Sequence, residues 1–191
     1  MRPGIAKVAF WAWVPVVLVP SSYLLAAHLV PLPRPLLEDP TLASGVQSLG
    51  PAGRWSAVHI LYGECGCSRR VFDHLLARGP EPGFQESIVL VGDRPSFRER
   101  AVARGFQVLL LSEAQLEERF HVISVPMLVL ADPRGEVRYA AGYTDTKQGP
   151  DIADLRLMRG LAQGTPAEAK PIFGCAVSSA LKDQLDPLGL R

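Results

Sequence analysis

The chain has few cysteines and almost no net charge, and each shortage excludes a class of protein. It has 191 residues, of which only three are cysteines, too few for a small domain held together by disulfides. Its 20 Lys and Arg side chains are balanced by 19 Asp and Glu, which leaves a net charge of +1. Nucleic-acid binding depends on an excess of positive charge, so no nucleic-acid partner is predicted. Because the cysteine count is odd, at least one thiol is left over, free or used in exchange.

The amino-terminal part lacks charged side chains for a long stretch. None occurs between Lys7 and Arg34, and the apolar run 8–30 is long enough to cross a hydrocarbon core of about 30 Å. Arg2 and Lys7 precede the run, which predicts a cytoplasmic amino terminus. We therefore expect a transmembrane anchor over 1–30. The alternative is a cleaved signal peptide, although no clean A-x-A site follows. Both interpretations export the rest of the chain.

The segment that follows, 31–54, is rich in proline and glycine and has no apolar period. Such a composition is typical of a partly extended linker. We expect the folded domain to occupy 55–191, including a carboxyl-terminal extension that contains a cysteine.

Strand and helix patterns alternate from residue 55 onward. Strands are predicted at 56–62, 86–93, 106–112, 126–132 and 136–143. Helices are predicted at 68–78, 95–104, 112–120, 151–162 and 176–185. Strands separated by helices and followed by a hairpin indicate an α/β fold, with a mixed sheet flanked by helices on both faces.

Two cysteines, Cys65 and Cys67, stand at the turn between the first predicted strand and the first predicted helix of this domain. Unpaired backbone N–H groups and the helix dipole give such a turn a partial positive charge, which favours a thiolate over a thiol. Arg69 and Arg70 act in the same direction, whereas the carboxylate of Glu64 opposes it. The position of the two thiols therefore indicates redox chemistry.

The order of elements over 55–162 resembles the thioredoxin-like superfamily. Two stretches carry this resemblance: the motif ECGCSRR (64–70), and FHVISVPMLVLADPRGEVRYAAGY (120–143), in which a proline opens a strand before a D-x-x-G turn. The resemblance implies that the Val125–Pro126 bond is cis, and that this proline lies against the active-site cysteines and helps to present substrate backbone. With the amino-terminal span included, the chain resembles membrane-anchored bacterial thiol–disulfide oxidoreductases.

The cysteine motif departs from the C-x-x-C spacing that is usual in this family. If Cys65 takes the first position, Ser68 stands where the second cysteine belongs, and the motif reads CGCS with Cys67 inside it. We expect Cys65 to be the more exposed thiol and the attacking nucleophile, with Cys67 resolving or sharing the disulfide. A Cys65–Cys67 bond would close a small, strained ring that is easy to reduce.

The third cysteine, Cys175, lies beyond the part that the resemblance covers, just before the predicted helix 176–185. A helix start would again favour the thiolate. Two hypotheses stay open: Cys175 pairs with Cys65 or Cys67, as a structural clasp or a resolving thiol, or it is an inert buried residue, which is common for free cysteine.

Together these features predict an exported, membrane-anchored protein that catalyses thiol–disulfide exchange, with Cys65, Cys67, Pro126 and Cys175 as its site residues. No organic cofactor is expected, because the protein's own thiols carry the electrons. The expected partners are exported thiol or disulfide proteins, and the inner membrane through the amino-terminal helix. The predicted location is the bacterial inner membrane, with a single pass and the domain in the periplasm or outside the cell.

Two alternatives belong to other classes of function. The first is a Cu(I)-binding assembly factor for a membrane oxidase, because two close cysteines can hold Cu(I). His121, just before the Pro126 loop, is the best-placed histidine for such a site, whereas His59 is expected inside a strand and His74 on a helix. No metal ligand is assigned on this basis. The second alternative is a non-catalytic thioredoxin-fold binding module.

Overall fold

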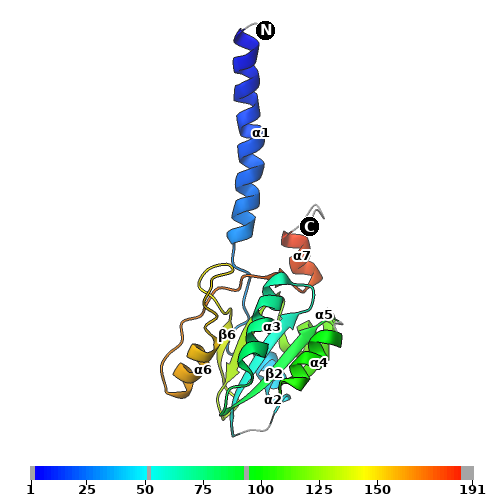
Figure 1. The fold of residues 1–191 in the computed structure, drawn as a ribbon, viewed down its shortest axis with the longest axis vertical. Helices are drawn as coiled ribbons and strands as arrows, with labels where there is room; N and C mark the ends of the chain where they lie inside the picture. The colour runs from blue at the N-terminus through cyan, green and yellow to red at the C-terminus, as the bar shows by residue number, and fades with distance from the viewer. Residues whose placement is uncertain (1–2, 51–52, 93–94, 186–191) are drawn as a thin grey trace. The chain divides into compact units, whose positions relative to one another are not determined.

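The computed structural model describes residues 3–50, 53–92 and 95–185, in two units, Met1–Val30 and Pro31–Arg191 (Figure 1). The first unit is a helix, α1 (Pro3–Leu29), with Pro15 and Pro20 in its interior. The predicted span 8–30 thus coincides largely with a helix, although the side chains of 23–29 lie outside the described residues. Within the described part of the chain, no helix is both long and apolar enough to cross a membrane. The transmembrane anchor stays a prediction from the sequence.

The second unit is built on a five-stranded mixed sheet with the order β3-β2-β1-β5-β6. Its strands are β1 (Trp55–Tyr62), β2 (Phe84–Val91), β3 (Gln107–Leu111), β5 (Met127–Ala131) and β6 (Val137–Ala141). The first three are parallel, whereas β5 pairs antiparallel with both β1 and β6. This is the thioredoxin-like sheet that the sequence predicts. A two-stranded sheet, β4 (Ser124–Val125) with β7 (Cys175–Ala176), was not predicted.

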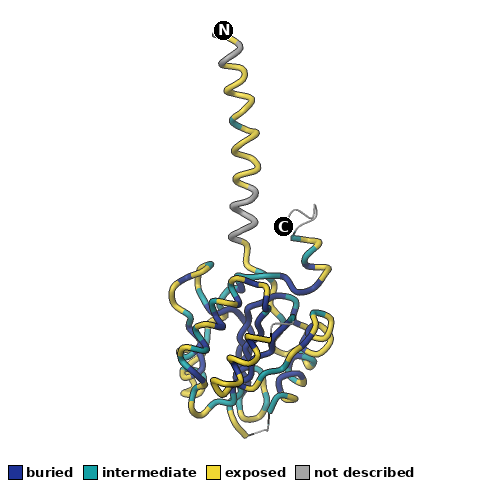
Figure 2. Tube along the Cα trace, turned by 45° about the vertical axis from the view of Figure 1, so that its right-hand side comes forward, coloured by how far each residue is buried: buried dark blue, intermediate teal, exposed yellow. Residues whose placement is uncertain are grey.

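Helices cover both faces of the sheet, as the alternating pattern predicts (Figure 1). One face carries α3 (Gly66–Arg78), α4 (Pro95–Ala103) and α6 (Asp154–Ala162), and the other carries α2 (Pro40–Gln47) and α5 (Glu113–Phe120). A last helix, α7 (Ser179–Leu185), follows β7. Figure 2 shows the buried residues gathered along the sheet, between these two layers. The sheet therefore has an apolar core on each side, and its central strands β2, β1 and β5 are buried on both faces.

The segment expected as an extended linker contains a helix that packs on the domain. Asp39 caps α2 by accepting a hydrogen bond from the backbone N–H of Thr41 at 2.8 Å. Leu42 and Val46 of α2 are buried in the same core as α5. Local propensity did not show this short helix, because tertiary packing rather than a strong apolar period stabilises it.

The helix α5 has a well-defined cap at each end, and β4 follows it in the chain. The helix begins with a capping box: the hydroxyl of Ser112 accepts from the backbone N–H of Gln115 at 3.2 Å, and the Gln115 side chain accepts from the Ser112 N–H at 2.9 Å. The helix ends at His121, whose backbone is left-handed with φ 50°. This cap turns the chain toward Val125 and Pro126.

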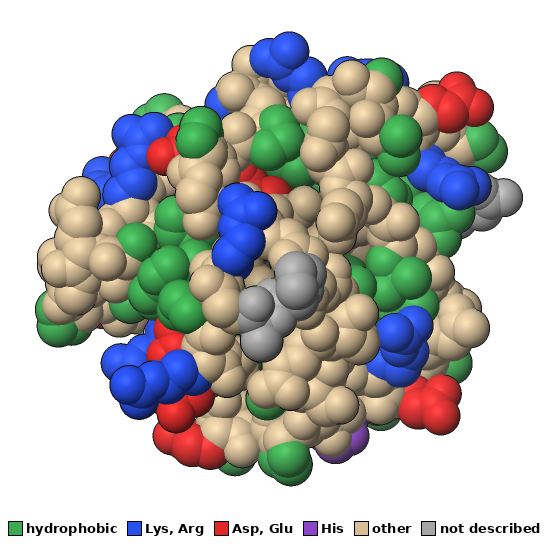
Figure 3. Space-filling model, turned by 90° about the horizontal axis from the view of Figure 1, so that it is seen from below, with side chains coloured by type: hydrophobic (Ala, Val, Ile, Leu, Met, Phe, Trp, Pro, Cys, Tyr) green, Lys and Arg blue, Asp and Glu red, His purple; other side chains and the backbone are tan. Residues whose placement is uncertain are grey.

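Charged side chains of both signs are mixed on the surface. Figure 3 shows one face of the molecule, on which Lys and Arg alternate with Asp and Glu between hydrophobic and other side chains. Exposed pairs such as Arg156 with Asp151, at 2.8 Å, belong to this mixed surface. On the face seen there, neither sign forms a continuous patch, in keeping with the net charge of +1.

Candidate active site

The candidate site begins where β1 passes into α3. Cys65 is the N-cap of α3, with extended backbone angles of φ −87° and ψ 121°. Its N–H donates to the carbonyl of Tyr62 at 3.1 Å, and its own carbonyl accepts from Arg69 N–H at 3.0 Å, the bond that opens the helix. Cys65 therefore lies at the positive end of the helix dipole, as its sequence position predicted.

A second element, the loop at Pro126, meets this helix start. The Val125–Pro126 peptide bond is cis, which confirms the prediction from the resemblance. The residues before it form β4, and β7 pairs antiparallel with them so that Val125 stands opposite Cys175. A disulfide joins Cys65 to Cys175 with a Cα–Cα distance of 6.1 Å.

The expected Cys65–Cys67 disulfide is absent, since Cys65 pairs with Cys175. Cys65 caps α3 and Cys67 belongs to its first turn, so the two side chains leave the helix in different directions. The hypothesis that Cys175 pairs with one of them is resolved in favour of Cys65. Cys175 itself lies in β7 and not at a helix start, because α7 begins only at Ser179.

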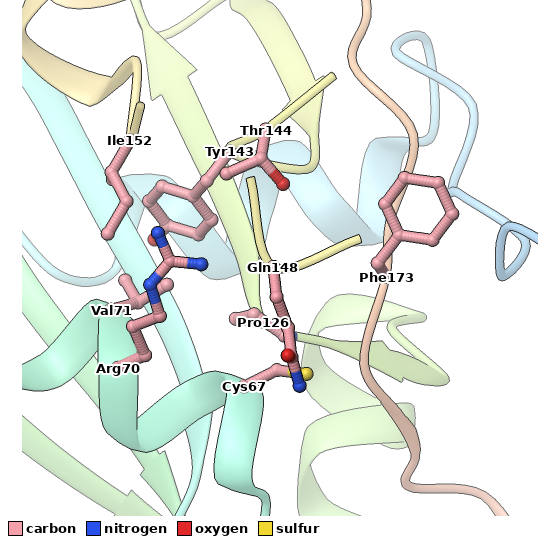
Figure 4. A pocket seen from close by; sticks show the side chains of 9 residues that line it. All are labelled: Cys67, Arg70, Val71, Pro126, Tyr143, Thr144, Gln148, Ile152 and Phe173. Carbon is pink, nitrogen blue, oxygen red and sulfur yellow. The ribbon is translucent and has the colours of Figure 1, made fainter. Parts of the chain in front are cut away.

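The expectation that Cys65 is the more exposed thiol is wrong. Cys65 is 2% exposed and sealed by the disulfide, whereas Cys67 is free and partly exposed. Cys67 lines a pocket of about 30 Å³, a volume that holds about one water molecule. Figure 4 shows Cys67 and Pro126 in the middle of this pocket, with Arg70 to one side and Phe173 to the other. The sulfur that is accessible, that of Cys67, is thus not the sulfur that forms the disulfide, that of Cys65, although both lie at the start of α3.

Ser68, which replaces the second cysteine of the family motif, has a structural contact. It is buried, and its hydroxyl accepts a hydrogen bond from the backbone N–H of Tyr62 at 3.1 Å. The hydroxyl therefore ties the end of β1 to the first turn of α3.

Two of the charged side chains expected to tune the thiols, Arg70 and Glu64, have partners of their own. The Arg70 guanidinium donates to the carbonyl of Gly149, and Glu64 accepts from the Tyr62 hydroxyl at 3.2 Å. Burial, reinforced by the carboxylates of Glu113 and Glu64, raises the pKa of Tyr62 to about 12, so this hydroxyl keeps its proton. Both charges are held in place close to the start of α3.

A network of buried charged side chains lies on the face of the sheet that carries α3 and α6. Arg78 of α3 donates to Glu86 at 2.7 and 3.0 Å and to Asp154 at 2.7 Å, and both carboxylates are fully buried. Burial alone would raise the pKa of Glu86, but hydrogen bonds from His59 and Arg78 outweigh it and lower the pKa to about 2. Among the described residues, no buried side-chain nitrogen or oxygen lacks a partner. The network fixes α3 to β2 and α6.

Tyr143 connects this network to the pocket. Its hydroxyl lies 3.0 Å from Nδ1 of His59 and donates to the carbonyl of Met127 at 3.2 Å, while Nε2 of His59 lies 2.8 Å from Glu86. Burial raises the pKa of Tyr143, so the hydroxyl stays protonated. Tyr143 also lines the pocket of Cys67. His59 lies in β1, as predicted, and its role is to fill this network.

The part of the chain that the structure describes shows no ligand set for the alternative function, Cu(I) binding. No group of three or more His, Cys, Asp or Glu side chains is arranged there to hold a metal ion. His121 instead lies 2.9 Å from a carboxylate oxygen of Asp39, and Cys65 is sealed in the disulfide.

Two solved structures match this chain at TM-scores of 0.50 and above, which supports the fold. A hypothetical protein from Sinorhizobium meliloti 1021 matches with a TM-score of 0.51 and 18% identity, covering 66% of this chain and 80% of that one. An uncharacterized conserved protein from Geobacillus kaustophilus matches with a TM-score of 0.50 and 13% identity, covering 79% and 91%. A thiol:disulfide interchange protein of the thioredoxin family from Chlorobium tepidum TLS matches with a TM-score of 0.43 and 15% identity, covering 71% and 95%. No protein-family model and no curated protein sequence matches this chain.

The sequence did not predict β7 or the approach of the segment that precedes it. A strand of two residues has no apolar period, and its partner β4 is equally short. The available signal was Gly174 immediately before Cys175, which indicated a turn but marks a close approach to Val125.

Proposed function

We propose that this protein carries out thiol–disulfide exchange, with Cys65 and Cys175 as its redox couple. One observation carries the proposal: the Cys65–Cys175 disulfide lies at the positive end of α3, beside Pro126, with a free third thiol in the adjoining pocket. The helix start favours the Cys65 thiolate, which is the form that attacks in exchange.

The exchange proceeds in two balanced steps. In the dithiol form, the Cys65 thiolate attacks one sulfur of a client disulfide; a Cys65–client bond forms, and the second client sulfur leaves as a thiolate. The Cys175 thiolate then attacks the Cys65 sulfur, which closes the Cys65–Cys175 disulfide and expels the first client sulfur. The client gains two electrons and two protons from the dithiol, and the reverse sequence oxidises a client dithiol. The protein's thiols carry the electrons, so the steps need no organic cofactor.

The proposal extends to the place of action. We infer that the domain works on exported proteins at the outer side of the bacterial inner membrane, held there by the segment 1–30. Support comes from the uncharged run 8–30 behind Arg2 and Lys7, and from the persistence of disulfides in exported compartments. A phosphatase reporter fused after residue 191 would be active only if the carboxyl end is exported, and an inactive, fully expressed fusion contradicts this part of the proposal.

A redox titration of the full chain tests the exchange. The folded protein is equilibrated with glutathione buffers of graded ratio and quenched, and its thiols are mapped by alkylation. We expect a single two-electron couple, with the Cys65–Cys175 bond opening above roughly −300 mV, the limit typical of purely structural disulfides. Cys65→Ser and Cys175→Ser each abolish the couple, whereas Cys67→Ser retains it. A bond that opens only after denaturation would identify a structural clasp and overturn the proposal.

A further inference from the structure

The partner of Cys65 is delivered by an extended segment of the chain, 170–177, which lies across β4 and Pro126. Upstream, Gly142 N–H donates to the carbonyl of Lys170 at 3.1 Å, and Leu32 N–H donates to the carbonyl of Ile172 at 2.8 Å. Downstream, Val177 N–H donates to the carbonyl of Ile123 at 2.9 Å. Between these anchors, Cys175 and Ala176 pair antiparallel with Val125 and Ser124 of β4, as two residues of a bound peptide would.

Gly174 sets how closely this segment approaches. A Cβ atom placed on Gly174 would overlap the carbonyl of Val125 and the ring of Pro126, both of which belong to the rigid loop and not to flexible side-chain ends. The backbone angles of Gly174 are not left-handed, so the requirement concerns space and not conformation. The position immediately before the exchanging cysteine therefore admits glycine and excludes every side chain.

The neighbouring side chains also contact the site. Phe173 lines the pocket together with Cys67 and Pro126, on the opposite side from Arg70 (Figure 4). Ala176, after the cysteine, is 9% exposed and stands opposite Ser124. Each residue of the sequence Phe-Gly-Cys-Ala is thus fitted to a different part of the site. Phe173 lines the pocket, Gly174 approaches Val125 and Pro126, Cys175 bonds to Cys65, and Ala176 stands opposite Ser124.

We propose that the client of this site is an extended peptide with glycine directly before its reactive cysteine, and that residues 173–176 are an internal copy of it. The inference rests on the proposed function, because it concerns the thiol that takes the place of Cys175. A client cysteine that bonds to Cys65 in the place of Cys175 stands opposite Val125, so the residue before it meets the same Val125 carbonyl that Gly174 meets. In the oxidising direction, the client thiolate attacks the Cys65 sulfur, a Cys65–client bond forms, and Cys175 leaves as a thiolate, which is the reverse of the second step above.

A matched pair of peptides tests this specificity on the full chain. The protein is the reduced Cys67→Ser/Cys175→Ser variant, in which Cys65 is the remaining thiol. The probes are capped Phe-Gly-Cys-Ala and Phe-Ala-Cys-Ala, each carrying 2-nitro-5-thiobenzoate on the cysteine sulfur as a coloured leaving group. Attack by Cys65 on the peptide sulfur releases the coloured thiolate, and mass spectrometry confirms the Cys65–peptide bond. We expect the glycine peptide to form that bond about tenfold faster or more, the size of effect that one overpacked carbon produces.

Oxidised glutathione serves as a third probe and separates the possible failures. Equal rates for the two peptides, or reaction with glutathione but with neither peptide, would overturn the glycine specificity and leave the exchange function standing. No mixed disulfide with any of the three probes would overturn the exchange function itself.

Substitutions within the chain give an independent measurement. In the wild-type cysteine background, Gly174→Ala should weaken the Cys65–Cys175 bond, so that its equilibrium with glutathione shifts toward the reduced form by about tenfold. Gly160→Ala in α6 is the matched control, because a Cβ atom there meets only Thr165 at an ordinary 3.8 Å. An unchanged equilibrium for Gly174→Ala would contradict the close approach on which the proposal depends.

Discussion

The two ends of the Cys65–Cys175 disulfide are held in very different ways. Cys65 belongs to α3, whose Phe72 and Leu75 are buried in the core and whose Arg78 is fixed by two buried carboxylates. Cys175 belongs to the two-residue strand β7, which is held by its pairing with β4, by backbone hydrogen bonds at Ile172 and Val177, and by the burial of these two side chains. The Cys65 end of the bond, here called the rigid end, is therefore held by a helix of 13 residues and by buried ion pairs. The Cys175 end, here called the attached end, is held by a short strand and the residues that flank it.

This contrast indicates which part moves when the disulfide opens. A backbone hydrogen bond contributes only about 1 kcal/mol, whereas removing one member of a buried ion pair costs about 3 to 5 kcal/mol. Reduction should therefore release the carboxyl-terminal segment and leave α3 in place. A scaffold that holds one sulfur still while its partner comes and goes is suited to exchange.

The largest effect is expected from Glu86→Gln, which weakens the rigid end. The variant removes the charge that pairs with Arg78 and His59 in a fully buried site, so the free energy of unfolding should fall by about 3 kcal/mol or more. Urea denaturation measures it, with Glu136→Gln as the control, because its pair with Arg138 is exposed and 3.5 Å long. Equal losses in the two variants would show that the buried network does not hold α3.

The same carboxylate predicts a pH dependence. The pKa of Glu86 falls from 4.5 to about 2 on folding, so its contribution to stability is complete above pH 4.5 and is lost as the pH falls through 2. Denaturation curves between these values should show stability decreasing with acidity in the wild type, and a shallower decrease in Glu86→Gln. If stability falls equally steeply with pH in the wild type and in Glu86→Gln, the pH dependence cannot be assigned to Glu86.

The next effect concerns the attached end. Cys175→Ser opens a loop with a sequence separation of 110 residues, and the loss of such a cross-link lowers the free energy of unfolding by about 3 kcal/mol. Amide hydrogen exchange should increase over 173–177 and change little over α3. Cys65→Ser should give the same two results, because both variants remove one bond. Increased exchange in α3 as well would mean that the two ends are not held differently.

Local patterns predicted the rigid end from the sequence, together with most of the fold. The strands are short apolar runs, α3 begins at a turn and ends before Gly79-Pro80, and α5 carries its capping box. The cis bond at Pro126 followed from the family resemblance that the contiguous stretch 120–143 carries. Each of these signals lies within a stretch of contiguous residues, which is what sequence reasoning can detect.

The attached end could not be predicted in the same way. The pairing of β4 with β7 joins residues about fifty positions apart through two-residue strands, and neither strand has a period of its own. The burial of Cys65 depends on that pairing, so the more exposed thiol was misassigned. The helix α2 was missed for a related reason, because Leu42 and Val46 acquire their role only by packing on α5.

A smaller effect is expected from Ser68→Ala, at the join between β1 and α3. The variant leaves the backbone N–H of Tyr62 without its acceptor, and an unsatisfied donor of this kind costs about 1 to 2 kcal/mol. Thermal or urea unfolding measures the loss, with Ser96→Ala on the exposed side of α4 as the control. If Ser68→Ala is as neutral as the control, the hydroxyl is not what ties the strand to the helix.

The smallest effect on stability is expected from Cys67→Ser, although this substitution should abolish the reaction of the oxidised chain with a maleimide. It should change the free energy of unfolding by less than about 0.5 kcal/mol, because the Cys67 side chain is partly exposed and makes no disulfide. The oxidised wild-type chain should nevertheless react with one equivalent of a maleimide, mapped to Cys67, and Cys67→Ser should not react. Labelling at Cys65 or Cys175 in the oxidised, folded chain would contradict the pairing. Since Cys65 and Cys67 are only two residues apart, labelling confined to Cys67 would show that the fold, and not the motif, decides which thiol is accessible.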